Sequence, residues 1–260
     1  MKARLIGLAI LFVFGVIRMP IEARVQKAQR DLHYHGATLN LDVRQELGQM
    51  GFIAALGGFR ALVADVMWIE AHDAWQRTEW GRMKVMFDTI TALQPRNVMF
   101  WEMAAWQMHT NASVAARENR NQPREALRLK AEMEYWQLGE DLLLRGIQNN
   151  PDRAKLYEQL GALRSDRFKP RFNDHAIAAW AYAEAAKRPD AMQYVHRFAL
   201  YELSKVPGKE RDAYEGLKAL FLKSDDERLP TLEKILGEME EKLSIPPEQR
   251  LIKPAAPPHK

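Results

Sequence analysis

The chain has 260 residues, no cysteine, and 38 basic against 34 acidic side chains, which gives a formal net charge of +4. A chain of this length can bury a sizeable core without disulfides or a structural metal. The absence of cysteine excludes thiolate metal sites, cysteine nucleophiles and redox pairs. Basic and acidic residues are mixed along the chain, which argues against nucleic acid as a partner. Strong helix formers dominate and glycine is scarce, which predicts an all-α fold.

The N-terminus carries thirteen uncharged residues, 5–17 (LIGLAILFVFGVI), which follow Lys2 and Arg4 and end at Arg18. A spanning helix needs about 17–25 apolar residues, and this stretch reaches the lower limit if the aliphatic stems of Arg4 and Arg18 are included. We expect residues 1–20 to be a signal-anchor in the inner membrane, with the bulk of the chain on the periplasmic side. A cleaved signal peptide is the alternative, although the local cleavage sequence is poor.

Residues 21–40 form a polar juxtamembrane segment, and residues 41–243 are expected to be one helical-repeat domain. Within it, residues 50–59 (MGFIAALGGF) are apolar but too short to span a membrane. We therefore expect a buried helix that ends at the Gly57-Gly58 pair.

Helix-length amphipathic stretches end repeatedly in a short segment that contains proline, at Pro95, Pro151 and Pro189. This cadence is typical of arrays of helix pairs. We expect pairs over about 64–95, 98–151, 154–189 and 198–225, followed by a capping helix over 226–243. The second pair is longer than the others, either through lengthened helices or through a loop around 116–128. Residues 244–260 contain five prolines and are expected to be an extended, unpacked tail.

The third pair has Tyr157, Leu160 and Gly161 where a tetratricopeptide repeat (TPR) has Trp, Leu and Gly, and residues 60–225 resemble the TPR superfamily. The first pair departs from the pattern at Glu70, where leucine is expected. The runs over 57–75 and 91–106 also resemble bacterial membrane-anchored repeat proteins of undefined function. The resemblance implies an α-solenoid of about four helix pairs with extra N- and C-terminal helices.

In TPR arrays the first helix of each pair lines a concave groove, so the resemblance also implies a partner-binding surface. Trp68, His72 and Trp75 recur at helical spacing and share one face. Such aromatic residues would suit a peptide or a glycan. The full implied set is Asp65, Trp68, His72, Trp75, Glu102, Trp106, His109 and Glu158.

An alternative reading of the same residues is structural. An extra helix over 41–59 would pack against the first groove helix, so that Trp68 and Trp75 are core. Asp65 would then be a buried acid paired with Arg60 or another arginine.

A basic patch lies between the helices of the third pair, where Phe168 and Phe172 are interleaved with four cations. Its cations are Arg164, Arg167, Lys169 and Arg171. It is either a solvated loop whose two rings tuck into the core or a contact for an anionic partner or lipid headgroup.

No zinc-protease, phosphate-loop or nucleophile-elbow motif occurs, and His33 and His35 have no third ligand nearby. We expect no cofactor, no metal, no catalytic residue and no small-molecule ligand. The expected function is a membrane-anchored scaffold that docks a protein partner in an envelope complex, of the secretion, pilus-type or transporter kind.

Two other functions stay open at this point. One is an envelope glycan-binding module that uses Trp68, Trp75 and Trp106. The other is an α-helical enzyme that uses Asp65, Glu102 and His72 or His109.

Overall fold

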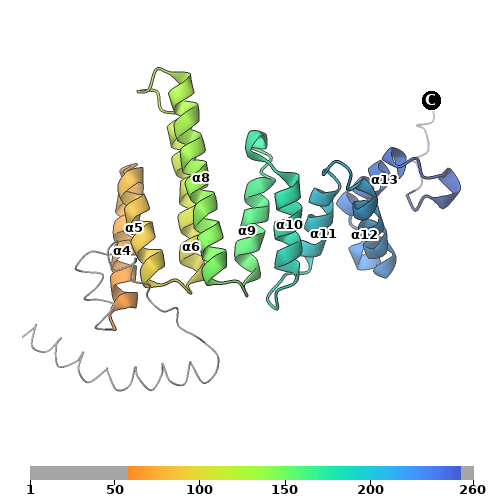
Figure 1. Cartoon of the computed structure of the whole chain (residues 1–260), viewed down its shortest axis with the longest axis horizontal. Helices are drawn as coiled ribbons and strands as arrows, with labels where there is room; N and C mark the ends of the chain where they lie inside the picture. The colour runs from red at the N-terminus through yellow and green to blue at the C-terminus, as the bar shows by residue number, and fades with distance from the viewer. Residues whose placement is uncertain (1–57, 253–260) are drawn as a thin grey trace, which may run out of the picture. The chain divides into compact units, whose positions relative to one another are not determined.

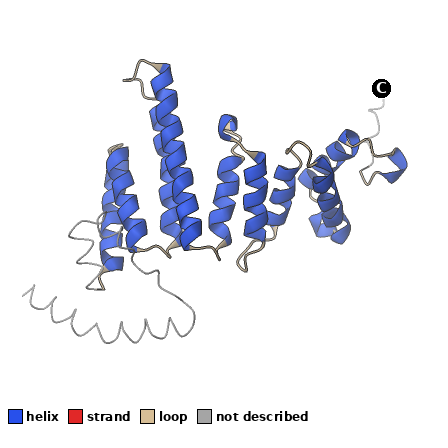
Figure 2. Cartoon of the chain, in the orientation of Figure 1, coloured by secondary structure: helices blue, strands red, loops and turns tan. Residues whose placement is uncertain are grey.

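A computed structural model describes residues 58–252 of the chain. Within that range the secondary structure is helical and contains no strand, which confirms the all-α class (Figure 1, Figure 2). The chain divides into two compact units with the boundary between Asn150 and Pro151. We describe residues 58–150 as the first unit and residues 151–252 as the second unit, each by itself.

The first unit consists of helices joined by short connections, in which α4 packs against α5 and the helix that begins with α6 packs against α8 (Figure 1). α6, a π-helix and α7 form one continuous helix from Val98 to Arg117. The elements are α4 (Arg60–Gln76), α5 (Trp80–Leu93), α6 (Val98–Trp106), η1 (Gln107–Ala112), α7 (Ser113–Arg117) and α8 (Glu125–Asn149).

The first helix pair is closely packed because the fully buried residues of α4 are all alanines. Ala64, Ala71 and Ala74 are its buried residues, and their small side chains let α5 approach. α5 buries large side chains at helical spacing, among them Met83 and Phe87.

The second pair is longer because both of its helices are lengthened. α8 has 25 residues and extends well past the ends of α4 and α5 (Figure 1). Residues 118–124 form the connection. Of the two alternatives that the sequence left open, lengthened helices are the correct one.

The proline-bearing stops lie directly after helices, as predicted. α5 and α8 end two residues before Pro95 and Pro151, respectively. The buried Asn150 joins these two stops, because its side-chain amide donates to the carbonyl oxygens of Pro95 at 2.9 Å and Gly146 at 3.0 Å.

The second unit continues the same pattern, and each of its α-helices contacts the next one along the chain. Asp174 caps α10, because its carboxylate accepts from the backbone N–H groups of Ala176 and Ile177 at 3.1 and 3.0 Å. The elements are α9 (Ala154–Arg164), η2 (Pro170–Phe172), α10 (His175–Ala186), α11 (Tyr194–Leu203), α12 (Glu210–Lys223), η3 (Asp225–Glu227), α13 (Pro230–Lys242) and η4 (Pro247–Gln249).

The C-terminal segment corrects the sequence prediction. Residues 244–252 are not an unpacked tail, because Ile245 is buried and Ile252 packs against the hydrophobic cluster of α12 and α13. The backbone N–H groups of Leu251 and Ile252 donate to the buried Glu240 carboxylate at 2.7 and 3.2 Å. Apolar side chains between the prolines and an internal acceptor therefore hold this segment. Residues 253–260 lie outside the described range.

Among the described residues, no helix is both long and apolar enough to cross a membrane. The predicted signal-anchor over 1–20, the juxtamembrane segment over 21–40 and the apolar helix up to Gly57 all lie outside the described residues.

Candidate partner-binding groove

An open, mainly apolar groove of about 280 Å³ lies in the first unit, where α4, α5 and the continuous helix that begins with α6 meet. α4 supplies most of the lining, and the other two helices supply the opposite walls. The lining residues are Trp68, Ile69, Ala71, His72, Trp75, Met83, Phe87, Met103 and Gln107.

Two tryptophans of α4 have different roles in this groove. The Trp68 ring is half-buried, and its centroid lies 5.8 Å from that of Phe87 and 5.3 Å from that of Phe100. It is therefore fixed in place. Trp75 is 37% exposed, and its ring lies 5.2 Å from the ring of His72. Trp75 thus exposes an aromatic surface to solvent beside the firmly packed ring of Trp68.

The groove has two polar side chains, His72 and Gln107, and each interacts with a residue of its own helix. A ring nitrogen of His72 lies 3.2 Å from the side-chain nitrogen of Gln76. The carbonyl oxygen of the Gln107 side chain accepts from Asn111 at 2.7 Å. The groove therefore offers chiefly apolar contact area, and a bound group would gain little from charge.

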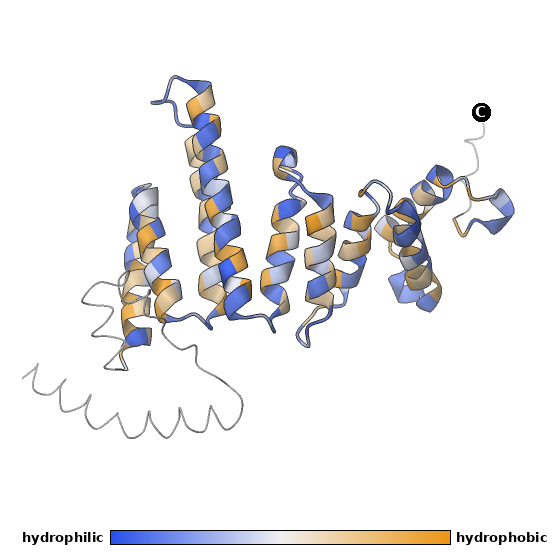
Figure 3. Cartoon of the chain, in the orientation of Figure 1, coloured by the Kyte–Doolittle hydropathy of each residue, from blue (hydrophilic) through white to orange (hydrophobic). Residues whose placement is uncertain are grey.

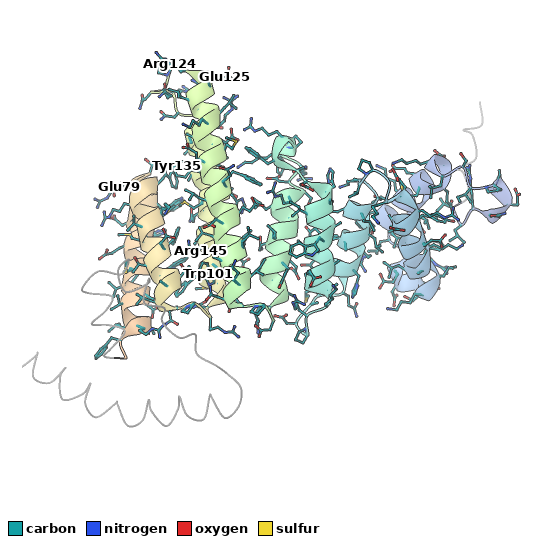
Figure 4. All side chains as sticks on the ribbon, viewed as in Figure 1. Glu79, Trp101, Arg124, Glu125, Tyr135 and Arg145 are labelled. Atoms are coloured by element: carbon teal, nitrogen blue, oxygen red, sulfur yellow. The ribbon has the colours of Figure 1, made fainter. Side chains whose placement is uncertain are left out.

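The helix that forms the far wall is held against its neighbours by Arg145 of α8. The guanidinium donates to Asp88 of α5 at 2.9 Å and lies 5.4 Å from the centre of the Trp101 ring of α6 (Figure 4). Burial lowers the pKa of Arg145, but the hydrogen bonds and charges of Asp88 and Asp141 together raise it by more, so the net direction is upward. This contact ties α5, α6 and α8 together and keeps the groove walls in register.

The structure brings Trp68, His72 and Trp75 together in one groove, as their spacing predicted. The structural alternative is partly wrong: Asp65 is exposed, and the Arg60 guanidinium donates instead to the carbonyl oxygen of Leu93 at 3.1 Å. Asp65 belongs to α4 but not to the groove lining.

The second helix pair places three of the predicted residues outside this groove. Glu102 is half-buried and Trp106 is exposed, both on α6. His109 lies in the π-helix, where its ring nitrogen is 3.0 Å from the hydroxyl of Thr110. These residues share the continuous helix with Met103 and Gln107 without lining the groove.

Glu158 is a correction to the predicted groove set. It belongs to the second unit and is buried, and its carboxylate accepts from the Tyr194 hydroxyl at 2.8 Å. Tyr194, the first residue of α11, thus contacts this position. Glu158 is thus an internal hydrogen-bond acceptor and not an exposed binding residue.

Tyr182 lies in the same interior. Its ring carbons come within 2.8 Å of the place where a Cβ on Gly161 would stand, so glycine is required for this close approach. Burial raises the pKa of Tyr182 to about 12.

Alkaline pH is expected to weaken the second unit through Tyr182. Because its folded pKa of about 12 exceeds the ordinary tyrosine pKa of 10.0, its contribution is complete below pH 10 and is lost as pH rises through 12. The loss should approach about 2 to 3 kcal/mol. Urea unfolding between neutral and strongly alkaline pH checks this, and Tyr182→Phe should make the decline shallower. An unchanged decline in that variant would contradict the assignment.

The basic patch forms an exposed turn around η2. Phe168 is 78% exposed, with the Arg167 guanidinium 4.6 Å from its ring centre. Arg171 lies 4.9 Å from the centre of the half-buried Phe172 ring. The other two cations of the patch, Arg164 and Lys169, are both half-buried. The expectation that both rings tuck into the core is therefore wrong for Phe168.

Sequence reasoning missed several groove residues and one further groove. Met83, Met103 and Gln107 come from helices other than α4, so no local pattern links them to it. The second unit has an apolar groove of about 350 Å³ between α10 and α11, beside Trp180, which is 49% exposed. The alanines before and after Trp180 at helical spacing were the available signal.

Among residues 58–252, no three or more histidine or acidic side chains are placed to hold a metal ion. The pair His33 and His35 lies outside that range. Comparisons with models of known protein families, with curated proteins and with solved structures each found no match.

Proposed function

We propose that this chain is a TPR-like scaffold without enzymatic activity that docks a protein partner in a bacterial envelope complex. Residues 1–20 would tether it to the inner membrane with the helical domain on the periplasmic side. The observation that carries the proposal is the open aromatic groove of the first unit, where a fixed Trp68 lies beside an exposed Trp75.

The arrangement of helices supports a repeat scaffold. Consecutive helices pack on one another in both units, and proline follows the second helix of the first three pairs. Small residues stand at close contacts between helices, at Gly139 and Gly161, and Ala71 is buried in the first pair. Arrays of this kind form extended surfaces that bind other molecules.

The groove chemistry favours a protein segment over a small molecule. Its volume of about 280 Å³ lies at the lower end of ligand pockets, which are about 300–1,000 Å³. Protein interfaces obtain most of their binding energy from a few aromatic or aliphatic anchors in such hollows. We expect a partner helix or extended segment that inserts one apolar side chain between Trp68 and Trp75.

An envelope glycan is the second candidate, and the exposed ring of Trp75 favours it because flat rings stack on sugars. The groove has two polar side chains, His72 and Gln107, and both are already hydrogen-bonded. Sugar hydroxyls would therefore find few partners. Added glycan fragments that shift the tryptophan fluorescence would favour this candidate instead.

Replacing Trp75 with alanine is expected to abolish partner capture while the fold is retained. The full-length chain, solubilised from membranes in detergent, would be used to pull down bound proteins, which mass spectrometry quantifies. An aromatic anchor contributes about 2 kcal/mol or more to an interface, so bound partner should fall at least tenfold. Circular dichroism confirms that the helices remain.

Trp106→Ala is the matched control, because Trp106 is also an exposed helical tryptophan of the first unit, at 41%, and does not line the groove. It should leave capture by the groove unchanged. Equal loss in both variants, or full capture by Trp75→Ala, would contradict the proposed site.

A further inference from the structure

The connection between α9 and α10 carries Phe168, the most exposed large apolar side chain among residues 58–252, at 78%. Figure 1 shows this connection beyond the adjoining ends of the two helices, and Figure 3 shows that it is largely hydrophilic. A single exposed apolar residue is common on proteins. The surroundings of Phe168 therefore decide whether its exposure has a function.

The turn that presents Phe168 is held by hydrogen bonds at its base and at its tip. The backbone N–H of Asp174 donates to the carbonyl oxygen of Arg164 at 2.9 Å, which closes the loop. At the tip, the side chain of Asp166 accepts from the backbone N–H of Phe168 at 2.8 Å. The carbonyl oxygen of Asp166 accepts from the N–H of Lys169 at 3.2 Å. An ordered turn thus presents the ring, and the two N–H groups beside it have partners.

Cations surround this ring, while the acidic residues of the turn serve the backbone. The Arg167 guanidinium lies 4.6 Å from the centre of the Phe168 ring, and Arg171 is also exposed. Asp166 accepts from the N–H of Phe168, and Asp174 caps α10. Residues 164–174 hold the four cations of the patch and these two acids, so the formal charge of the turn is +2.

We propose that this turn binds the surface of an anionic phospholipid membrane. Phe168 enters the interface between headgroups and acyl chains, and Arg167 and Arg171 bind headgroup phosphates beside it. Backbone polar groups that leave water need partners within the protein. The two N–H groups at the tip of the turn meet that condition.

A membrane fits this turn better than a protein partner does. A stable protein interface has about 20–30 residues on each side, whereas the projecting turn consists of residues 164–174 with one strongly exposed ring. A lipid surface needs no complementary shape, because its headgroups rearrange around an inserted side chain. Each cation close to an anionic surface strengthens binding about fivefold, which makes the contact of one turn weak by itself.

This inference rests on the proposed function in one respect, because the tether over 1–20 would bring a membrane within reach. Attachment of the chain raises the effective concentration of the turn at the lipid surface, so a weak contact suffices. The groove of the first unit takes no part in it.

The absence of cysteine from the chain allows a probe to be placed on the turn. Phe168→Cys is labelled with the environment-sensitive fluorophore NBD, and the full-length chain is reconstituted into lipid nanodiscs. The discs contain either phosphatidylcholine alone or phosphatidylcholine and phosphatidylglycerol in equal amounts. We expect the NBD emission to rise about twofold or more in the anionic discs only, and to fall back in high salt, which screens surface charge.

Met192→Cys with the same label is the matched control. Met192 is 59% exposed and lies beyond the opposite end of α10, in the connection to α11. Its emission should be the same in both kinds of disc. The neutral discs retain the chain only if the proposed tether is right, so failure of the tether and failure of this inference are seen separately.

Two pairs of substitutions test the cations, each with the probe at position 168. Arg167→Gln with Arg171→Gln should weaken the contact about 25-fold and abolish the rise in emission, because two cations are lost. Arg167→Lys with Arg171→Lys should retain the rise, because a lipid surface responds to charge more than to guanidinium geometry. Circular dichroism verifies the helices in each variant.

The inference is overturned by equal emission in neutral and anionic discs, or by equal responses at positions 168 and 192. An unchanged rise in the Arg→Gln pair would also overturn it, because the cations would then have no part in the contact. A probe that stays in water in the anionic discs, and is shielded only when a membrane-protein extract is added, would assign the turn to a protein partner instead.

Discussion

Replacing Gly139 with valine is expected to lower the free energy of unfolding by about 3 kcal/mol, one of the two largest effects that we expect from a single substitution. Gly139 of α8 lies against the continuous helix that contains the π-segment. A Cβ there would stand 2.6 Å from the Cβ of His109 and 2.9 Å from the carbonyl oxygen of Ala105. One neighbour is backbone and the other is the first side-chain atom, so neither can move without shifting its helix.

The matched control for this substitution is Gly81→Val. Gly81 is also helical, but a Cβ added to it would meet nothing within 4 Å. We expect a change within about 0.5 kcal/mol, as for most surface positions. Urea unfolding followed by far-UV circular dichroism measures both variants. Similar midpoints for the two would mean that α8 does not approach the π-helix as closely as described.

Replacing Glu240 with alanine is expected to cost about 2 to 4 kcal/mol and to release the C-terminal segment. The carboxylate is buried and accepts from the backbone N–H groups of Leu251 and Ile252. Its loss leaves a cavity and two N–H groups without this acceptor, and a hydrogen bond to a charged group contributes about 1.5–3 kcal/mol. Urea unfolding measures the stability, and the rate of tryptic cleavage after Arg250 measures the release.

Glu241→Ala is the control, because the neighbouring glutamate is exposed. It should leave both the unfolding midpoint and the cleavage rate nearly unchanged. The unfolding midpoint and the cleavage rate of Glu240→Gln should lie between those of Glu240→Ala and Glu241→Ala, because the amide oxygen still accepts one hydrogen bond. Rapid cleavage after Arg250 in the unaltered chain would contradict the packing of residues 244–252.

Helix boundaries could be predicted because the signals that end a helix are local. Proline lacks an N–H and clashes with the preceding turn, so Pro95 and Pro151 marked helix ends without any tertiary information. The prolines of the C-terminal segment led to the wrong prediction of an unpacked tail over 244–252, because proline reports only on local backbone structure. They correctly excluded a long helix over 244–252, but whether Ile245 and Ile252 pack depends on the apolar surface that α12 and α13 form together.

Only the wall of the candidate groove that α4 contributes could be predicted from the sequence. Trp68, His72 and Trp75 share a face of α4 because helical periodicity alone puts them there. Met83 and Met103 reach the same groove from α5 and α6, and their contribution follows from how those helices pack. Glu158 was predicted to be exposed from its position in the repeat, but Tyr194, which is distant in sequence, contacts it in the structure.

The sequence by itself determined the all-α class, the positions of the helix pairs and the shared face of the α4 aromatics, since propensity, proline and helical periodicity act over a few residues. Only the tertiary structure decided that Trp75 is exposed, that Glu158 and Glu240 are internal acceptors, and that the end of the described chain packs on α13. Burial is set by which surfaces meet, and those surfaces bring together residues that are 11 to 36 positions apart.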